Sequence, residues 1–242
     1  MLRAAIALLI VILLGVAFHA DGAFYKLGTH RDALRQASVY GILACGMTLV
    51  IVTGGIDLAA GSILGFTAVC FSMMSIWWNW SPWLSVPASL AIGGACGAVS
   101  GSLVVWPRLQ PFIATLAMMV FARGLAKTVS GGVKVSTALP NGDGTFRYVQ
   151  VPDFFRMIDS RIFGGNLSMV TVIFLVIAAG AGLLLARHIW GRDLYAIGGN
   201  EEAARLSGLP VKRSKLLAYV ASGLCAAAAG ICQAKYRTLL VD

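Results

Sequence analysis

The feature that most restricts the fold of this chain is its near lack of charge over residues 36–122. Within that stretch the only formally charged side chains are Asp57 and Arg108. The whole 242-residue chain is 58% hydrophobic and only 12% charged, whereas a soluble globular chain carries about 25% charged residues. Apolar segments of about 20 residues are typical of helices that span a bilayer. The sequence therefore excludes a soluble fold and predicts an all-α, polytopic integral membrane bundle embedded in the lipid bilayer.

Seven apolar segments are long enough, or nearly long enough, to cross the membrane. The first has 15 residues behind Arg3, and a basic residue before a short apolar run also describes a signal peptide. No small-x-small cleavage site follows it and a further span comes soon after, so we expect a signal-anchor-like first span. The seven predicted spans, which form a single transmembrane domain over 1–242, are residues 4–18, 37–56, 58–78, 82–106, 112–129, 167–186 and 216–232.

Basic residues in the loops predict which way the bundle faces. Loop 187–215 holds six Lys and Arg, and the longer loop 130–166 holds four. Because cytoplasmic loops carry the excess of basic residues, we expect 187–215 in the cytoplasm. Counting back through six spans places the N-terminus in the cytoplasm and 130–166 outside, with a short interfacial helix at 153–159. The basic link 21–36 falls outside on this count, against the rule. The net charge of +9 is explained by these loops, so we expect no nucleic-acid partner.

Asp57 stands among apolar residues, just after the pair Gly54-Gly55. A carboxylate at membrane depth costs roughly 2.5 to 3.5 kcal/mol on insertion scales, and each glycine weakens a helix by about 1 kcal/mol relative to Ala. The segment therefore predicts a break in the helix, which is tolerated at that depth where it is buried in protein or lines a wet cavity. Two interpretations remain open: a polar hinge on a translocation path, or a short interfacial loop in which Asp57 caps the next helix.

Glycines four residues apart predict close contact between membrane helices. Gly61 and Gly65 form one such pair, and Gly93, Gly97 and Gly101 repeat the spacing in the span 82–106. We expect the glycine face of that span to pack on another helix, with lipid behind it.

Loop 187–215 contains a short helix with both ends specified. Asn200 is a favourable N-cap, and Glu201 and Glu202 suit the positive end of a helix dipole. Glu201 and Arg205 are spaced to pair across one turn, and Gly208 ends the helix. Isolated helices shorter than about 12 residues are marginal in water, so this one must rest against something. It either docks onto a cytoplasmic partner or packs on the chain's own helix ends.

No arrangement of residues points to catalysis. The five cysteines and three histidines are isolated, without the spacing of a metal site or a disulfide framework. The sequence contains no G-x-x-x-x-G-K-[ST] nucleotide motif and no Ser/His/Asp or paired-carboxylate constellation. We therefore expect no catalytic residue, no metal and no cofactor, and the intramembrane acids are too few for a proton relay.

Three segments resemble, in order and spacing, the permease subunits of bacterial ABC importers for ribose and other simple sugars. They are residues 46–65, residues 111–116 with 123–125, and residues 191–208 with 212–230. The resemblance covers about residues 36–233. It implies a non-enzymatic, multi-pass permease of the bacterial inner membrane that forms the path for a ribose-like monosaccharide. It also implies three partners: an ABC ATPase subunit that hydrolyses the ATP, a second permease subunit, expected to be an identical copy, and a periplasmic sugar-binding protein.

The resemblance also assigns roles to single residues. Segment 200–208 matches the cytoplasmic loop that such permeases present to their ATPase, and segment 53–61 matches a signature near the translocation path. The implied ATPase-coupling residues are Asn200, Glu201, Glu202, Ala203, Arg205 and Gly208. The implied translocation-path residues are Thr53, Gly54, Gly55, Asp57 and Gly61.

The chain departs from the family pattern in three places. Ala59-Ala60 stands where Ser-Val is usual, the external loop carries a polar insert at 140–144, and family members continue with several spans beyond the region that matches Gln233. We therefore expect a permease domain that is incomplete at its C-terminus, either a fragment or a natural short form. Two alternatives remain open: a branched-chain amino-acid permease of the same architecture, and a secondary carrier that works without nucleotide.

Overall fold

The computed structural model describes residues 2–140, 145–149 and 153–234. Six helical segments in this part of the chain are long and apolar enough to cross a membrane. They are α2 (Leu27–Val52), α3 (Ala60–Ser72) with its π-helical continuation η2 (Met73–Trp77), α4 (Pro82–Val105), α5 (Pro111–Val129), α7 (Met169–Arg187) and α10 (Val211–Gln233). The first predicted span, α1 (Leu2–Ala17), has 16 residues and falls short of that length. The all-α bundle predicted from the sequence is confirmed.

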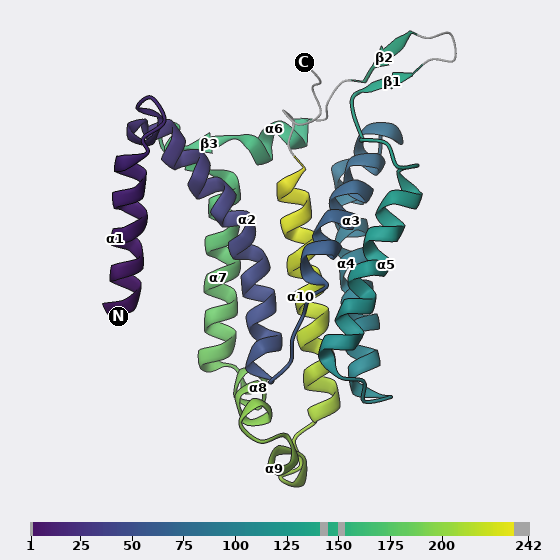
Figure 1. Ribbon diagram of the computed structural model, residues 1–242. Helices are drawn as coiled ribbons and strands as arrows, with labels where there is room; N and C mark the ends of the chain where they lie inside the picture. Colours follow the sequence, from purple (N-terminus) through teal and green to yellow (C-terminus); the bar gives the residue numbers. More distant parts are fainter. Residues whose placement is uncertain (1, 141–144, 150–152, 235–242) are drawn as a thin grey trace.

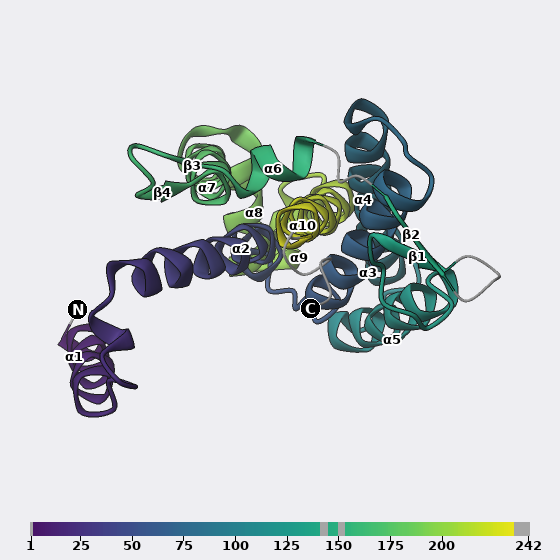
Figure 2. The same cartoon turned by 90° about the horizontal axis from the view of Figure 1, so that it is seen from above.

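The spanning helices alternate in direction and gather around α10. In Figure 1, α2, α4 and α7 run toward the end that holds the short helices α8 and α9, whereas α3, α5 and α10 run away from it. Figure 2 shows α10 between α2 on one side and α3 and α4 on the other, and all three contact it. In both views α1 stands apart from the other helices.

Small residues bring α4 and α10 close together. A Cβ added at Gly93 would lie 2.5 Å from the carbonyl oxygen of Gly223, and one added at Gly97 would lie 2.3 Å from that of Tyr219. At Gly101 the nearest atom, the Cβ of Tyr219, would be 2.9 Å away. The glycine face of α4 is therefore the face that packs on the central helix, and its backbone leaves no room for side chains.

The helices at the rim present apolar side chains outward. On α7, Leu175, Val176 and Leu183 are 53%, 67% and 59% exposed, and on α5, Val120 and Phe121 are 63% and 56% exposed. Large exposed apolar surfaces are unfavourable in water but match the acyl chains of a bilayer.

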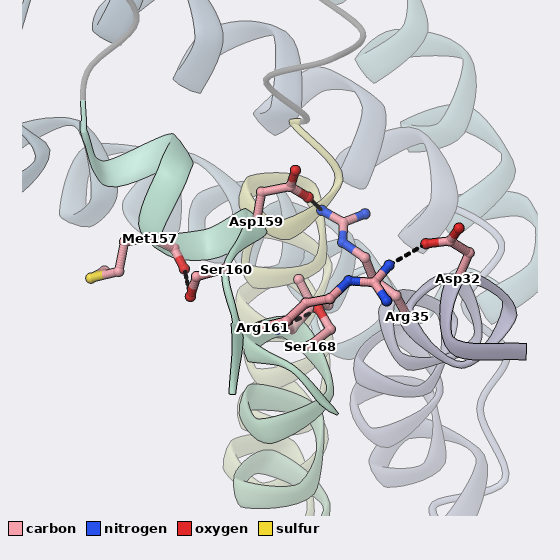
Figure 3. A network of polar contacts seen from close by, with 8 residues as sticks. Asp32, Arg35, Met157, Asp159, Ser160, Arg161 and Ser168 are labelled. Atoms are coloured by element: carbon pink, nitrogen blue, oxygen red, sulfur yellow. Dashed lines mark hydrogen bonds and ion pairs between the residues drawn. The ribbon is translucent and has the colours of Figure 1, made fainter. Parts of the chain in front are cut away.

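At one end of the bundle α2 is longer than the sequence predicts. The 3₁₀ turn η1 (Ala23–Tyr25) leads into it, and residues 27–36, expected to be part of a polar link, form its first turns. Ion pairs hold these turns against the loop before α7. Arg35 Nη2 lies 3.0 Å from Asp159 Oδ1, and Arg161 Nη2 lies 2.5 Å from Asp32 Oδ1 (Figure 3). The link prediction was wrong because these partners lie more than 120 residues away in sequence.

The loop 130–166 carries short elements at the same end. The helix expected at 153–159 is present as α6 (Asp153–Asp159). Strands β1 (Ala138–Pro140) and β2 (Phe146–Tyr148) pair antiparallel, as do β3 (Arg161–Ile162) and β4 (Leu167–Ser168). Residues 141–144 of the polar insert lie outside the described residues. The opposite end holds α8 (Ile189–Gly199) and α9 (Glu201–Leu206).

Candidate functional site

The break predicted before Asp57 is present between α2 and α3. Helix α2 ends at Val52, and the next helix begins only at Ala60. The Thr53 hydroxyl donates to the carbonyl oxygen of Val50 at 2.7 Å, and Gly54 has φ 75°, a left-handed conformation that favours glycine. Figure 1 shows the connecting segment turning back from the end of α2 toward the middle of the bundle. The chain therefore crosses part of the bundle without helical structure.

Asp57 is buried and fully engaged by hydrogen-bond donors. Its side chain is 3% exposed. Oδ1 accepts from the backbone N–H of Ala59 at 3.0 Å, and Oδ2 accepts from the hydroxyl of Ser222 on α10 at 2.6 Å. The first bond orders the turn that leads into α3, since Ala59 directly precedes that helix. The second joins the segment to the central helix α10. Because the segment also connects two antiparallel spans (Figure 1), both interpretations of Asp57 stay predictions.

Tyr219 and Gly55 make a second contact between the break and α10. The Tyr219 hydroxyl donates to the carbonyl oxygen of Ile56 at 3.3 Å. A Cβ at Gly55 would lie 2.9 Å from that hydroxyl and 2.9 Å from a methyl group of Val50. Gly55 is therefore needed for space, whereas Gly54 is needed for its backbone conformation. Neither role is visible from the sequence, which shows only two adjacent glycines.

Gly61 and Gly65 lie away from the contact that their spacing predicts. A Cβ at either position would meet no atom within 4 Å among the described residues, so neither packs against another helix there. The close contact between α3 and α10 is made instead by Gly230, where a Cβ would lie 2.5 Å from the Thr67 hydroxyl and 2.6 Å from the carbonyl oxygen of Leu64. The side of α3 near Gly61 carries Ser62, which accepts a hydrogen bond from Arg123 Nε of α5 at 3.0 Å.

The short helix predicted after Asn200 is α9, and its capping follows the sequence. Asn200 Oδ1 accepts from the N–H of Ala203 at 2.9 Å. At the other end Gly208 has φ 81° and donates its N–H to the carbonyl oxygen of Arg205. Ala204 is buried with Ile197. One face of α9 thus rests on the chain's own helix ends, which was one of the two expected arrangements.

Charges on α9 pair differently from the sequence prediction. The predicted pair of Glu201 with Arg205 is wrong. Arg205 Nη2 bonds Glu202 Oε1 at 2.5 Å, and Glu201 Oε2 accepts from Lys215 Nζ of α10 at 2.6 Å. The hydrogen bond from Arg205, with the positive charges of Arg205 and Arg108, holds the pKa of the Glu202 carboxyl below its ordinary value. Glu201 therefore ties α9 to the central helix, whereas Glu202 and Arg205 pair with each other and stay exposed.

A contact that the sequence did not predict joins α8 to the segment that follows α2. A Cβ on Gly198, near the end of α8, would lie 1.9 Å from the carbonyl oxygen of Val52 and 3.5 Å from the N–H of Gly54. Helix α8 thus packs backbone to backbone on the last residue of α2. The helix that precedes segment 200–208 is therefore in direct contact with the end of the helix that precedes segment 53–57.

The architecture is that of a polytopic α-helical membrane protein in which a non-helical segment joins two spanning helices, α2 and α3, and lies against a third, α10. The chain belongs to the family described as "Branched-chain amino acid transport system / permease component", which matches residues 31–240.

Three curated relatives are similar to this chain over most of its length. The ribose import permease protein RbsC of Escherichia coli (strain K12) is 36% identical over 225 residues, which cover 92% of this chain and 66% of the relative. The fructose import permease protein FrcC of Rhizobium meliloti is 32% identical over 231 residues, 94% of this chain and 62% of the relative. The xylose transport system permease protein XylH of Escherichia coli (strain K12) is 29% identical over 273 residues, 93% and 70% of the two chains. The chain thus spans about two thirds of the length of these relatives. No solved structure matches it significantly.

Proposed function

We propose that this chain is the permease subunit of an ABC importer that moves a simple sugar across the bacterial inner membrane. The observation that carries the proposal is the similarity over 92% of the chain to a ribose import permease. Relatives named for fructose and xylose support the same substrate class. A branched-chain amino acid is the second candidate, favoured by the description of the matching family.

The proposal assigns the end with α8 and α9 to the cytoplasm and to an ATPase subunit. The excess of basic residues in loop 187–215 supports this orientation, which also places the N-terminus inside. Leu206 is 78% exposed, and Glu202 and Arg205 lie exposed beside it, so α9 offers a partner both an apolar and a charged contact. ATP hydrolysis is assigned to that partner. A second permease copy and a periplasmic sugar-binding protein complete the proposed importer.

The contact of Gly198 with Val52 supplies a physical route from the ATPase to the sugar path. Helices α8 and α9 are joined by Asn200 alone, so a partner that moves α9 also moves α8. Because Gly198 touches the backbone of Val52, that movement reaches the end of α2. The hydrogen bonds that Ser222 and Tyr219 of α10 donate to Asp57 and Ile56 then break or re-form. A hinge of this kind turns a small displacement at one end into a switch between two packed states.

Transport assays test the proposal. Cells that lack the gene should lose uptake of one radiolabelled sugar among ribose, fructose and xylose, and should regain it when the gene is restored. Uptake should also require the cognate ATPase subunit. Loss of leucine uptake with unchanged sugar uptake would favour the amino-acid alternative, and sugar uptake that survives loss of the ATPase would favour a secondary carrier.

Two substitutions test the assigned coupling helix in the same cells. Glu201→Lys reverses the charge that faces Lys215, and Gly208→Trp forces a large side chain into a left-handed position. Both should abolish uptake and weaken recovery of the ATPase with the permease. If both variants import sugar and retain the ATPase normally, α9 is not the coupling element.

A further inference from the structure

A groove of about 710 Å³ opens between the turn that joins α4 to α5 and the start of α10, beside α9. Its wall is apolar at Val104, Val105, Leu109 and Val211. Helix α4 ends at Val105 and α10 begins at Val211. The apolar wall therefore lies where the spanning segments end, at the boundary between acyl chains and headgroups.

The rim of the groove is mainly basic, although Glu201 also lines it and Glu202 lies within the electrostatic reach of Arg108. Arg205 and Lys215 also line it, but they pair with Glu202 and Glu201. For Arg108, Lys212 and Arg213, the part of the chain that the structure describes provides no ion-pair partner, and all three side chains are exposed.

The N-termini of two helices add to the positive electrostatic potential of the groove. Helix α5 begins at Pro111 and α10 at Val211, both on the groove wall. Neither has a side-chain cap or an acidic residue in its first turn. The first N–H groups of a helix have no intrahelical acceptor and carry partial positive charge. Basic residues are disfavoured there, yet α10 places Lys212 and Arg213 in that turn. An anion bound in the groove would offset this arrangement.

We propose that the groove binds an anionic phospholipid. The phosphate group lies among Arg108, Lys212 and Arg213, and an acyl chain lies along the apolar wall. Basic pockets between spanning helices on the cytoplasmic side are suited to anionic headgroups. A free phosphate compound shares the headgroup chemistry but leaves the apolar wall uncovered. The lipid-binding proposal does not depend on the proposed transport function. The assignment of the groove to the inner leaflet does depend on it.

Lipid titration of the purified protein tests the proposal. Delipidated protein in detergent is titrated with phosphatidylglycerol, phosphatidylcholine and glycerol phosphate, and bound ligand is counted by native mass spectrometry. The double variant Lys212→Gln/Arg213→Gln removes the basic residues of the α10 turn. The matched control Arg187→Gln/Arg192→Gln removes the same charge from exposed positions at the same end of the bundle.

The proposal predicts that phosphatidylglycerol binds more tightly than the other two ligands and that the groove variant weakens it roughly thirtyfold, from the typical contribution of two basic residues. The control should change it less than about threefold. Equal weakening in both variants would show a nonspecific surface-charge effect and overturn the proposal. Glycerol phosphate that binds as tightly as the lipid would overturn it too. Unchanged lipid affinity in the groove variant would also overturn it, and weaker recovery of the ATPase with that variant in the cell assay would then favour an acidic protein segment as the occupant.

Folding is checked separately in phosphatidylcholine alone. The two double variants should show the same helicity and melting temperature there, so that a difference in phosphatidylglycerol affinity reports the groove. Sugar uptake is not part of this readout, and failure of the lipid proposal is therefore distinguishable from failure of the transport proposal.

Discussion

Replacing Gly198 by Ala should separate ATP hydrolysis from sugar movement. The added Cβ would lie 1.9 Å from the carbonyl oxygen of Val52. Ordinary contact between nonbonded heavy atoms needs about 3.5 Å, so α8 must move away from the end of α2 by about 1.5 Å. Overpacking of this kind costs about 1–3 kcal/mol, and Ala returns up to about 1 kcal/mol of helix propensity. We expect the free energy of unfolding to fall by about 1 kcal/mol.

The effect on transport should be larger than the effect on stability. In proteoliposomes that contain the full importer, Gly198→Ala should reduce sugar uptake at least tenfold while ATP hydrolysis continues, because the point at which α8 pushes on α2 is displaced. Gly199→Ala is the matched control, since a Cβ there meets nothing within 4 Å. It should transport as the unmodified protein does. Wild-type uptake in Gly198→Ala, or an equal loss in both variants, would refute the proposed route.

Three further outcomes are expected. Ser222→Ala removes the donor to the buried Asp57 carboxylate. The free energy of unfolding, measured by chemical denaturation, should fall by about 1.5–3 kcal/mol, as for other hydrogen bonds to charged groups. A loss below about 0.5 kcal/mol would contradict a stabilising role for this bond. Gly97→Ala places a Cβ 2.3 Å from a backbone oxygen of α10 and should lower the melting temperature. Gly180→Ala is the control, because a Cβ there meets no atom within 4 Å, and it should leave the melting temperature unchanged. Equal melting temperatures for the two variants would contradict the close packing of α4 on α10. The pKa of Glu202 is lowered by its partner Arg205, so their pairing stabilises α9 above the ordinary carboxyl pKa and is lost as pH falls through the lowered value. Carbon-13 NMR should therefore show the Glu202 pKa rising toward its ordinary value in Arg205→Gln, and an unchanged pKa would exclude the pair.

Features set by neighbouring residues were predictable from the sequence. The N-cap at Asn200 and the end of α9 at Gly208 depend on local backbone geometry, and both are present as expected. Six of the seven predicted spans followed from apolar length, whereas the first, α1, falls short of it in the part of the chain that the structure describes. The end of α2 before Asp57 followed from two glycines beside an isolated charge. These signals need no knowledge of the tertiary structure.

Features set by distant residues were not predictable. Glu201 pairs with Lys215 instead of Arg205 because packing brings the start of α10 beside α9. Gly65 and Gly97 both belong to glycine pairs four residues apart. Only Gly97 lies on a helix face that packs against a neighbouring helix, so only there is a side chain excluded. The contact of Gly198 with Val52 could not be predicted, because a contact between two backbones leaves no pattern of side chains in the sequence.

The central claim is that α9 lies in the cytoplasm and receives the ATPase. In a cysteine-free background, Leu206→Cys places a thiol at a position that is 78% exposed, and Met157→Cys places one at the opposite end of the bundle, where the side chain is 52% exposed. The account predicts that a membrane-impermeant maleimide labels Leu206→Cys only in inside-out vesicles and Met157→Cys only in right-side-out vesicles, with bound ATPase protecting the first. Labelling of Leu206→Cys in sealed right-side-out vesicles would contradict it.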